Sequence, residues 1–387
     1  MALPLTYNIR NIFVRWRATL ATVLGVALVV AVYMLVESLA IGLEKSSRNT
    51  GDARNVMIVR KGSTAESSSI ITREQFKLIE YLPQIDRNAK GEPLVSADVV
   101  ALVSLPRREG NGEAHVLFRG ISPVGMDLRP QVALAGGRWF SPGQREVVVS
   151  RRLAARFANF EIGAKFRIAS KELTVVGWTD GRNSAFDSEA WMDADEVRAI
   201  FDRAQYSSVL ARVSDPALAK NFINRIESEK RLALRADQET KYYSAQTMTA
   251  MPIKILGQFL ATAMSIGAIF AAMNTMYASV GSRTREIGTL RVLGFRRRTI
   301  LLSFLLEGAF LALIGGVLGC LLSLPLHGYS TATISLESFS ESVFQFRITP
   351  LLALKGLLFS VAVGILGSLL PAVRAARLPV IAALKAV

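Results

Sequence analysis

Four long apolar stretches alternate with polar segments along this chain. They lie at 18–43, 254–281, 299–326 and 351–373, and each has the length of about 20 mostly apolar residues that a helix needs to cross a bilayer. The first apolar run is too long for a cleaved signal peptide and is interpreted as an anchor. The pattern predicts four transmembrane helices, with the segment 44–253 inserted between the first and second.

The inserted segment 44–253 has the pattern of a folded α+β domain. Thr72 and Gln75 form a capping-box pattern that predicts a helix from Thr72 to Leu82, and Pro216 is typical of a first helical turn. Short runs rich in Val, Ile and Leu predict strands between such helices. We expect two lobes with a boundary at 119–137. The predicted strands are 55–59, 94–105, 114–119, 145–150, 165–168, 173–178 and 206–213.

A short charged segment, 282–298, separates the second and third apolar stretches. It is too polar for the bilayer and too short for a domain. Ile287, Leu290 and Leu293 recur at a spacing of three, which predicts one face of a helix, and Gly294 is typical of a residue that ends a helix. The segment therefore predicts an amphipathic helix at the membrane surface that can receive force from a partner. Charged residues border this face: Arg283, Arg285, Glu286, Arg296, Arg297 and Arg298.

The positions of the basic residues predict how the chain is oriented. Arg10, Arg15 and Arg17 precede the first apolar stretch, whereas Arg374, Arg377 and Lys385 follow the fourth. By the positive-inside rule, the N-terminus 1–17, the segment 282–298 and the tail 374–387 are expected in the cytoplasm. The domain 44–253 and the loop 327–350 are then expected on the opposite side.

Composition excludes several classes of function. The 387 residues are 51% hydrophobic, with a mean hydropathy of +0.32, which is too apolar for an ordinary soluble protein. The net charge of +15 comes with arginines placed at the ends of the apolar stretches, so we expect no nucleic-acid partner.

The motifs of common enzymes are also missing. The sequence contains no Walker A loop, no Gly-x-Ser-x-Gly and no His-Glu-x-x-His, which predicts that the chain is not itself an enzyme. Cys320 is its single cysteine and lies in the third apolar stretch, while His115 and His327 are its only histidines. We therefore expect neither an internal disulfide nor a metal site.

Glu307 lies about one third of the way into the third apolar stretch. A carboxylate at that depth is costly unless it is paired, which makes Glu307 a membrane-buried functional candidate. A proton relay and a structural polar contact both remain open, with the contact favoured. Glycine and serine also recur at near-four-residue spacing in the third and fourth stretches, which predicts that these two helices pack closely on one another. These residues are Gly308, Gly315, Gly316, Gly319, Gly356, Ser360, Gly364 and Gly367.

The sequence 285–294, Arg-Glu-Ile-Gly-Thr-Leu-Arg-Val-Leu-Gly, with the basic run to Arg298, resembles the loop between helices two and three of the FtsX-like, MacB-type ABC transporter permeases. Glu307 and the glycines after it are similar to the third helix of that family. The run from Pro371 to Pro379 is similar to the family's C-terminal tail. Segments 137–140, 145–153 and 175–177 resemble parts of the MacB-type periplasmic core domain.

This resemblance implies a non-catalytic permease subunit of the bacterial inner membrane that binds no cofactor. ATP and Mg²⁺ belong to a partner ABC ATPase dimer, which holds 283–298 as a coupling helix with Arg374 and Arg377 beside it. A second permease copy is implied, as a homodimer or a heterodimer. Some members also use a periplasmic adaptor and an outer-membrane channel. In this picture, movement of the coupling helix reaches the outer domain, 44–253, through the first two helices. This mechanotransmission drives export or extraction of a hydrophobic or amphipathic substrate from the outer leaflet of the lipid membrane or from the periplasm.

Two alternatives accompany this interpretation. The chain is also compatible with an FtsX-like signalling scaffold that activates a periplasmic cell-wall hydrolase, although the size of segment 44–253 favours transport. The arginines of 283–298 are also compatible with a role confined to fixing the topology by contact with lipid phosphates.

Overall fold

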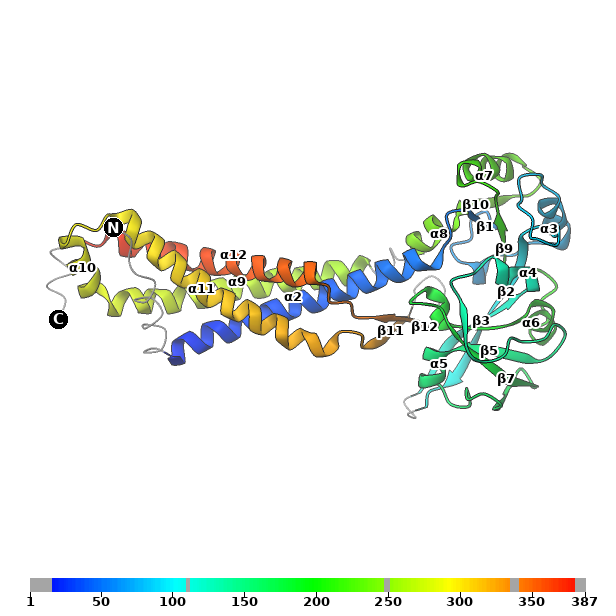
Figure 1. Ribbon diagram of the computed structural model, residues 1–387, viewed down its shortest axis with the longest axis horizontal. Helices are drawn as coiled ribbons and strands as arrows, with labels where there is room; N and C mark the ends of the chain where they lie inside the picture. Colours follow the sequence, from blue (N-terminus) through cyan, green and yellow to red (C-terminus); the bar gives the residue numbers. More distant parts are fainter. Residues whose placement is uncertain (1–15, 109–111, 247–250, 335–340, 380–387) are drawn as a thin grey trace. The chain divides into compact units, whose positions relative to one another are not determined.

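The computed structural model describes residues 16–108, 112–246, 251–334 and 341–379. It divides into two compact units (Figure 1). One unit comprises 1–41, 252–329 and 346–387, and the other comprises 42–251 and 330–345. The predictions for Arg10, Arg15 and Lys385 lie outside the described residues.

Four long helices form the first unit, as the apolar pattern predicts. They are α2 (Trp16–Thr50), α9 (Met251–Ser282), α11 (Arg297–Ser323) and α12 (Pro350–Arg377). Each is long and apolar enough to cross a membrane. The helix α2, with 35 residues, is longer than a bilayer requires, and its last turns from Gly42 onward belong to the second unit.

Glycines allow α11 to approach two helices at backbone distance. A Cβ atom on Gly364 of α12 would lie 2.6 Å from the carbonyl oxygen of Gly308, so the predicted packing of α11 on α12 is confirmed at this point. Gly315 and Gly319 do not face α12, contrary to the prediction. Their Cβ positions lie 2.8 Å and 2.6 Å from carbonyl oxygens of α2. The spacing pattern showed that α11 packs closely, but neighbouring positions on a helix point in different directions and therefore meet different partners.

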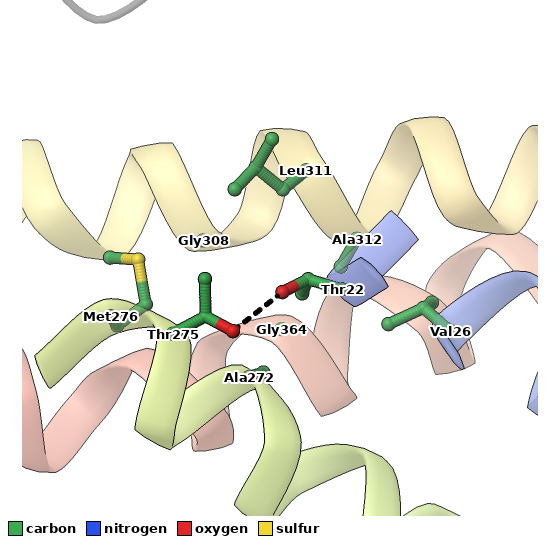
Figure 2. A pocket seen from close by; sticks show the side chains of 9 residues that line it. All are labelled: Thr22, Val26, Ala272, Thr275, Met276, Gly308, Leu311, Ala312 and Gly364. Carbon is green, nitrogen blue, oxygen red and sulfur yellow. Dashed lines mark hydrogen bonds between the residues drawn. The ribbon is translucent and has the colours of Figure 1, made fainter. Parts of the chain in front are cut away.

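The helices α2 and α9 are joined by a hydroxyl pair (Figure 2). Thr22 donates to Thr275 over 3.0 Å, and Thr275 in turn donates to the carbonyl oxygen of Ala271 over 3.0 Å. These two threonines line a small pocket among all four helices, next to Gly308 and Gly364. Both hydroxyl protons are thus satisfied away from water, as apolar surroundings require.

The second unit is built on one mixed sheet of ten strands, mostly antiparallel, which confirms an α+β domain between the first and second long helices. Its order is β10-β1-β9-β2-β3-β8-β5-β7-β4, and β6 pairs with β7. Only β3 with β8 and β5 with β7 run parallel. The strands are β1 (Asn55–Arg60), β2 (Val95–Pro106), β3 (Glu113–Ile121), β4 (Ala133–Gly137), β5 (Glu146–Ser150), β6 (Lys165–Ile168), β7 (Lys171–Asp180), β8 (Glu189–Asp193), β9 (Ser208–Arg212) and β10 (Leu234–Gln238).

Short helices connect these strands. The helix α3 begins with the predicted capping box, in which Thr72 and Gln75 exchange hydrogen bonds, so that prediction is confirmed. Pro216 begins a 3-10 turn before α7 rather than the helix itself. The helices are η1 (Glu66–Ser68), α3 (Arg73–Glu80), α4 (Pro123–Asp127), α5 (Arg151–Arg156), η2 (Ala185–Ser188), α6 (Ala194–Ile200), η3 (Pro216–Leu218), α7 (Ala219–Ser228) and α8 (Glu239–Gln246).

The predicted lobe boundary at 119–137 is wrong. One apolar core uses residues between Val99 and Ile200, while a second combines residues 56–97 with residues 209–236. The first lobe is thus inserted into the second, and the sheet runs through both. An insertion of this kind depends on strand pairing between distant segments, such as β1 with β9 and β10, which local sequence does not report.

The connection between α11 and α12 folds as a hairpin and belongs to the second unit. Strands β11 (Ser330–Ile334) and β12 (Glu341–Gln345) pair antiparallel. The backbone of Gln345 lies so close to α2 that a Cβ atom on Gly42 would clash with its carbonyl oxygen. Two residues later, the backbone N–H of Arg347 donates to the carbonyl oxygen of Ser38 over 3.2 Å. The predicted loop 327–350 is therefore structured where it is described.

We predict that Gly364→Ala separates α11 from α12 and destabilises the helix unit by about 1–3 kcal/mol, because the new methyl group meets the Cβ atom of Ala312 and the backbone of Gly308, neither of which is the movable end of a side chain. Thermal unfolding of the detergent-solubilised chain measures the effect. Gly25→Ala in α2 is the matched control, since nothing lies within 4 Å of its Cβ position. Equal unfolding temperatures for the two variants would contradict the close approach.

Candidate functional site

The predicted amphipathic helix is present as α10 (Thr284–Val292). Only Arg283 separates it from the end of α9. Gly294 adopts a φ of +91°, and the N–H of Phe295 donates to the carbonyl oxygen of Leu290 over 3.1 Å. A left-handed glycine with this bond is a standard helix stop, so the prediction for Gly294 is confirmed.

The apolar residues of α10 do not share one outward face. Ile287 is 2% exposed and packs into a cluster with Val280 of α9, Phe304 of α11 and Ala375 of α12. Leu290 is half-buried, whereas Leu293 is 68% exposed. Residues six apart differ by about 120° around a helix of 3.6 residues per turn, which explains why Ile287 and Leu293 point apart.

The sequence interpretation also missed Val292. Its side chain is 62% exposed at the last residue of α10, next to Leu293. The outward apolar surface therefore consists of Val292 and Leu293, which we call the apolar tip, while Ile287 anchors the helix. Two adjacent apolar residues at the C-terminal end of a charged segment were the available sequence signal.

Most of the predicted charged residues surround this tip at the surface. Arg285, Glu286 and the run Arg296 to Arg298 are exposed. Arg291, which the sequence interpretation did not select, is half-buried and donates to the carbonyl oxygen of Phe295 over 3.5 Å. The result is an exposed apolar tip bordered by guanidinium groups that are accessible to acidic partners.

Arg283 does not belong to this surface, contrary to its predicted role as a contact residue. Its side chain is 9% exposed and forms an ion pair with Glu307 of α11, whose side chain is 7% exposed, over 3.0 Å. The guanidinium also lies 5.1 Å from the ring centroid of Phe304. A carboxylate inside an apolar span needs such a partner, so this pair supports the structural role for Glu307 over a proton relay.

The last turns of α12 lie near the same end of the helix unit. Arg374 and Arg377 are exposed there, and the Arg374 guanidinium lies 5.7 Å from the ring centroid of Tyr277 on α9. Ala375 packs in the cluster that holds Ile287. Tertiary packing thus brings α10 and the basic end of α12 together, as expected for residues that act at one surface.

A second site, absent from the sequence interpretation, lies inside the α+β domain between α2 and α9, which we call the outer domain. Arg119 is 1% exposed and binds Glu189 through two hydrogen bonds of 2.8 Å. It also binds Glu66 at 2.7 Å and 3.0 Å, and Asp98 at 3.2 Å. Asp98 also accepts a hydrogen bond from the buried Arg129. We call these five side chains the ionic network.

The ionic network fills space among strands of both lobes. Its members come from η1, β2, β3, β8 and the segment after α4. Burial alone raises the pKa of Glu66, but the charge and hydrogen bonds of Arg119 outweigh that effect and hold the pKa below its usual value. Because the three carboxylates already accept hydrogen bonds from arginines, this arrangement serves structure rather than acid–base chemistry. Across the described residues, no three His, Cys, Asp or Glu side chains are placed to hold a metal ion.

Glu239 lies next to this network at the first residue of α8. It is fully buried, and its Oε2 accepts hydrogen bonds from the backbone N–H of Asp52 at 2.8 Å and from Asn55 Nδ2 at 2.9 Å. Burial raises the pKa of Glu239 to about 7, against the opposing charge of Arg129. The carboxyl group therefore fastens the segment after α2 to the start of α8, close to where the chain enters and leaves the domain.

Comparison with known proteins matches two parts of the chain to family models. Residues 18–229 match the family described as the MacB-like periplasmic core domain, and residues 258–380 match the FtsX-like permease C-terminal family. The matches together cover α2, most of the outer domain and the helices from α9 to α12, including α10.

Individual relatives agree with these matches. The chain is 36% identical over 300 residues to the uncharacterized ABC transporter permease YknZ of Bacillus subtilis, which covers 73% of each chain. It is 27% identical over 407 aligned positions to the macrolide export ATP-binding/permease protein MacB of Photorhabdus laumondii, covering 96% of this chain and 60% of the relative. A second MacB, from Bordetella avium, is 26% identical, with 76% of this chain and 48% of that protein covered. The chain thus spans about half to three fifths of the length of these MacB proteins.

We predict that the stability of the outer domain falls as the pH rises from 5 to 8, through Glu239. Its folded pKa of about 7 lies above the ordinary value of 4.5, so the contribution is fully present below pH 4.5 and is lost as the pH passes about 7. Full ionisation costs on the order of 3 kcal/mol. Denaturant unfolding of the full chain measures this dependence. It is monitored by tryptophan fluorescence, to which the buried Trp191 of the outer domain contributes.

Glu239→Gln supplies the comparison for this experiment. Glutamine keeps an oxygen acceptor for Asp52 and Asn55 but does not ionise. The slope of the unfolding free energy against pH between 5 and 8 becomes smaller in this variant. Other groups, such as Asp187, whose pKa is raised by burial, contribute to the slope equally in both proteins. Identical slopes in the two proteins would contradict a buried titrating carboxyl at this position.

Proposed function

The chain belongs to the FtsX-like ABC transporter permease family with a MacB-like periplasmic core domain, and we propose that it couples ATP hydrolysis by a separate ATPase to movement of that domain. It is a multi-pass membrane protein of this permease type. In the proposal, the chain binds no cofactor itself, and the partner ATPase dimer binds ATP and Mg²⁺.

The apolar tip of α10 is the observation that carries this proposal. Val292 and Leu293 are 62% and 68% exposed at the C-terminal end of α10, where exposed arginines lie on either side in the sequence. A groove on a partner removes this tip from water, while acidic groups at its rim meet the exposed arginines at 285 and 296–298. A helix that only contacts lipid would place the same tip among acyl chains, and it would then not bind the ATPase.

Coupling also requires that the contacted helix cannot slip. Ile287 and Arg283 fix α10 to the other helices of its unit, one through apolar packing and one through an ion pair. When a partner binds one position of the tip more tightly than another, it shifts α10 toward that position. The helices that are fixed to α10 then move with it. This is the mechanical property expected of a coupling helix.

The orientation and cargo complete the proposal. We assign 1–17, 282–298 and 374–387 to the cytoplasm, and 44–253 with 327–350 to the opposite side of a bacterial inner membrane, on the basis of the basic residues at the helix ends. The cargo we propose is hydrophobic or amphipathic and is exported or extracted from the outer leaflet or periplasm. A periplasmic adaptor and an outer-membrane channel are further proposed partners.

We also propose a second permease copy beside α9. The exposed residues of α11 between Leu302 and Leu322 are all large and apolar, as suits contact with lipid chains. The exposed positions of α9 between 262 and 278 are mostly small or polar instead. Small residues favour close helix contact, and an exposed amide such as that of Asn274 gains from a polar partner. These positions are Thr262, Ala263, Ile266, Gly267, Phe270, Ala271, Asn274 and Ala278.

We predict that Leu293→Asp weakens binding of the partner ATPase about 30-fold or more, because a carboxylate in an apolar groove costs about 2 kcal/mol. Val292→Asp has the same effect, and Leu290→Asp a smaller one because that side chain is half-buried within the chain itself. Binding of the purified ATPase to the reconstituted permease, together with ATP hydrolysis by the complex, measures this loss.

Tyr81→Asp is the control, since Tyr81 is a 79% exposed apolar side chain of the outer domain, away from α10 in the sequence. Membrane insertion should be unchanged in all four variants. Normal ATPase binding by Leu293→Asp would defeat the assignment of α10. Stimulation of the complex by a cell-wall hydrolase, with no response to lipids, lipoproteins or drugs, would favour the signalling scaffold over transport.

A further inference from the structure

The link between α10 and α11 differs from the link between α9 and α10. One residue, Arg283, lies between α9 and α10, so a displacement of α10 passes directly to α9. Four residues, 293–296, lie between α10 and α11, and Gly294 among them has a φ of +91°. Because this turn interrupts the helix at a residue without a side chain, it transmits a displacement less directly than a continuous helix does.

A side-chain contact bypasses this turn. Arg283 precedes α10 and pairs with Glu307, which lies ten residues after the first residue of α11. At 1.5 Å per residue, Glu307 is about 15 Å along α11 from its start. The pair therefore joins the N-terminal end of α10 to the middle of α11, rather than to the turn at 293–296 that precedes α11.

The pair is also held on several sides. The Arg283 guanidinium contacts Glu286 at 3.5 Å and lies 5.1 Å from the ring centroid of Phe304. Both partners of the Arg283–Glu307 pair are less than a tenth exposed. Separating them removes the ion pair between two side chains that are largely shielded from water, so the contact resists displacement better than a surface ion pair does.

We propose that Arg283 is a positioning residue that fastens α10 to α11, so that α11 forms a second line of transmission alongside α9. This inference rests on the proposed function of α10 and adds a route to it. Arg283 acts through Glu307 and not by contact with the ATPase. In R283M, only the apolar cluster of Ile287 and Phe304 still links α10 to α11, so α11 follows α10 less closely, whereas α9 remains joined directly to α10.

The C-terminal end of α11 connects this second line of transmission to the outer domain. After α11 the chain passes through η5 (Leu324–Leu326) into the hairpin β11–β12. That hairpin belongs to the same compact unit as the outer domain, where β12 lies against η2 and β3. Movement along α11 thus arrives at the outer domain through a connection separate from α2 and α8.

The experiment compares nucleotide responses at two labelled positions in the permease–ATPase complex, reconstituted in lipid nanodiscs. Cys320 is the single cysteine, so Cys320→Ser provides a cysteine-free background. A polarity-sensitive fluorophore is attached at Leu322→Cys on α11 or at Ile255→Cys on α9, which are 62% and 57% exposed. The change in emission between ATP with Mg²⁺ and ADP is recorded at each position.

The expected result is selective. With R283M the response at position 322 falls by more than half, the response at 255 is kept, and the ATPase still binds. R283M/E307M recovers most of the response at 322, because two apolar side chains of similar length replace the ion pair without leaving a buried charge. K165M is the matched control, since the Lys165–Glu172 pair is 62% and 54% exposed, and its loss should change neither response.

Three outcomes would overturn the inference. Equal responses at 322 in R283M and the parent chain would remove the role of the ion pair. If R283M fails to assemble, R283A/E307A decides, because it removes both charges and leaves no side chain long enough to replace the contact; an assembled R283A/E307A variant with the parent's response at 322 would refute a fastening role. A parent chain that binds no ATPase, or that lacks a response at 255, would instead refute the proposed function itself and the inference with it.

Discussion

An ionisable side chain that is removed from water must find a partner, and this constraint shapes both units of the molecule. Glu307 lies within the apolar helix α11 and forms an ion pair with Arg283, the residue between α9 and α10. Inside the outer domain, Glu66, Asp98 and Glu189 surround Arg119, and Arg129 supplies a further positive charge. In each case, the pairing requires elements that are distant in the sequence to keep a fixed relation, because loss of one partner leaves the other buried and charged.

This constraint gives the helix α10 two different sides. Its inner side is closed by Ile287 in an apolar cluster and by Arg283 in an ion pair. Its outer side keeps Val292 and Leu293 exposed among arginines. A helix that is fixed on one side and exposes apolar surface on the other has the properties needed to receive a displacement from a partner and pass it to its neighbours.

The two lobes of the outer domain are held by a related device. The ionic network joins segments from both lobes, and Glu239 ties the start of α8 to the turn that follows α2. Breaking such a network is costly, so the domain is suited to respond as one body to movement of the segments that connect it to the membrane helices. The hairpin β11–β12 adds one more connection from the same helix unit.

The sequence alone determined the four membrane helices, the α+β domain between the first two, the helix before Gly294 and the capping box at Thr72, because each depends on local hydrophobic pattern or backbone preference. It did not determine the direction in which Ile287 points, the partner of Glu307 or the buried position of Arg119. Apolar strand runs that contain a charge, such as 95–100 with Asp98, give a faint signal of a buried network but do not name its members. Tertiary structure decided these features, since burial and pairing depend on which distant segments meet, and period and spacing carry no information about that.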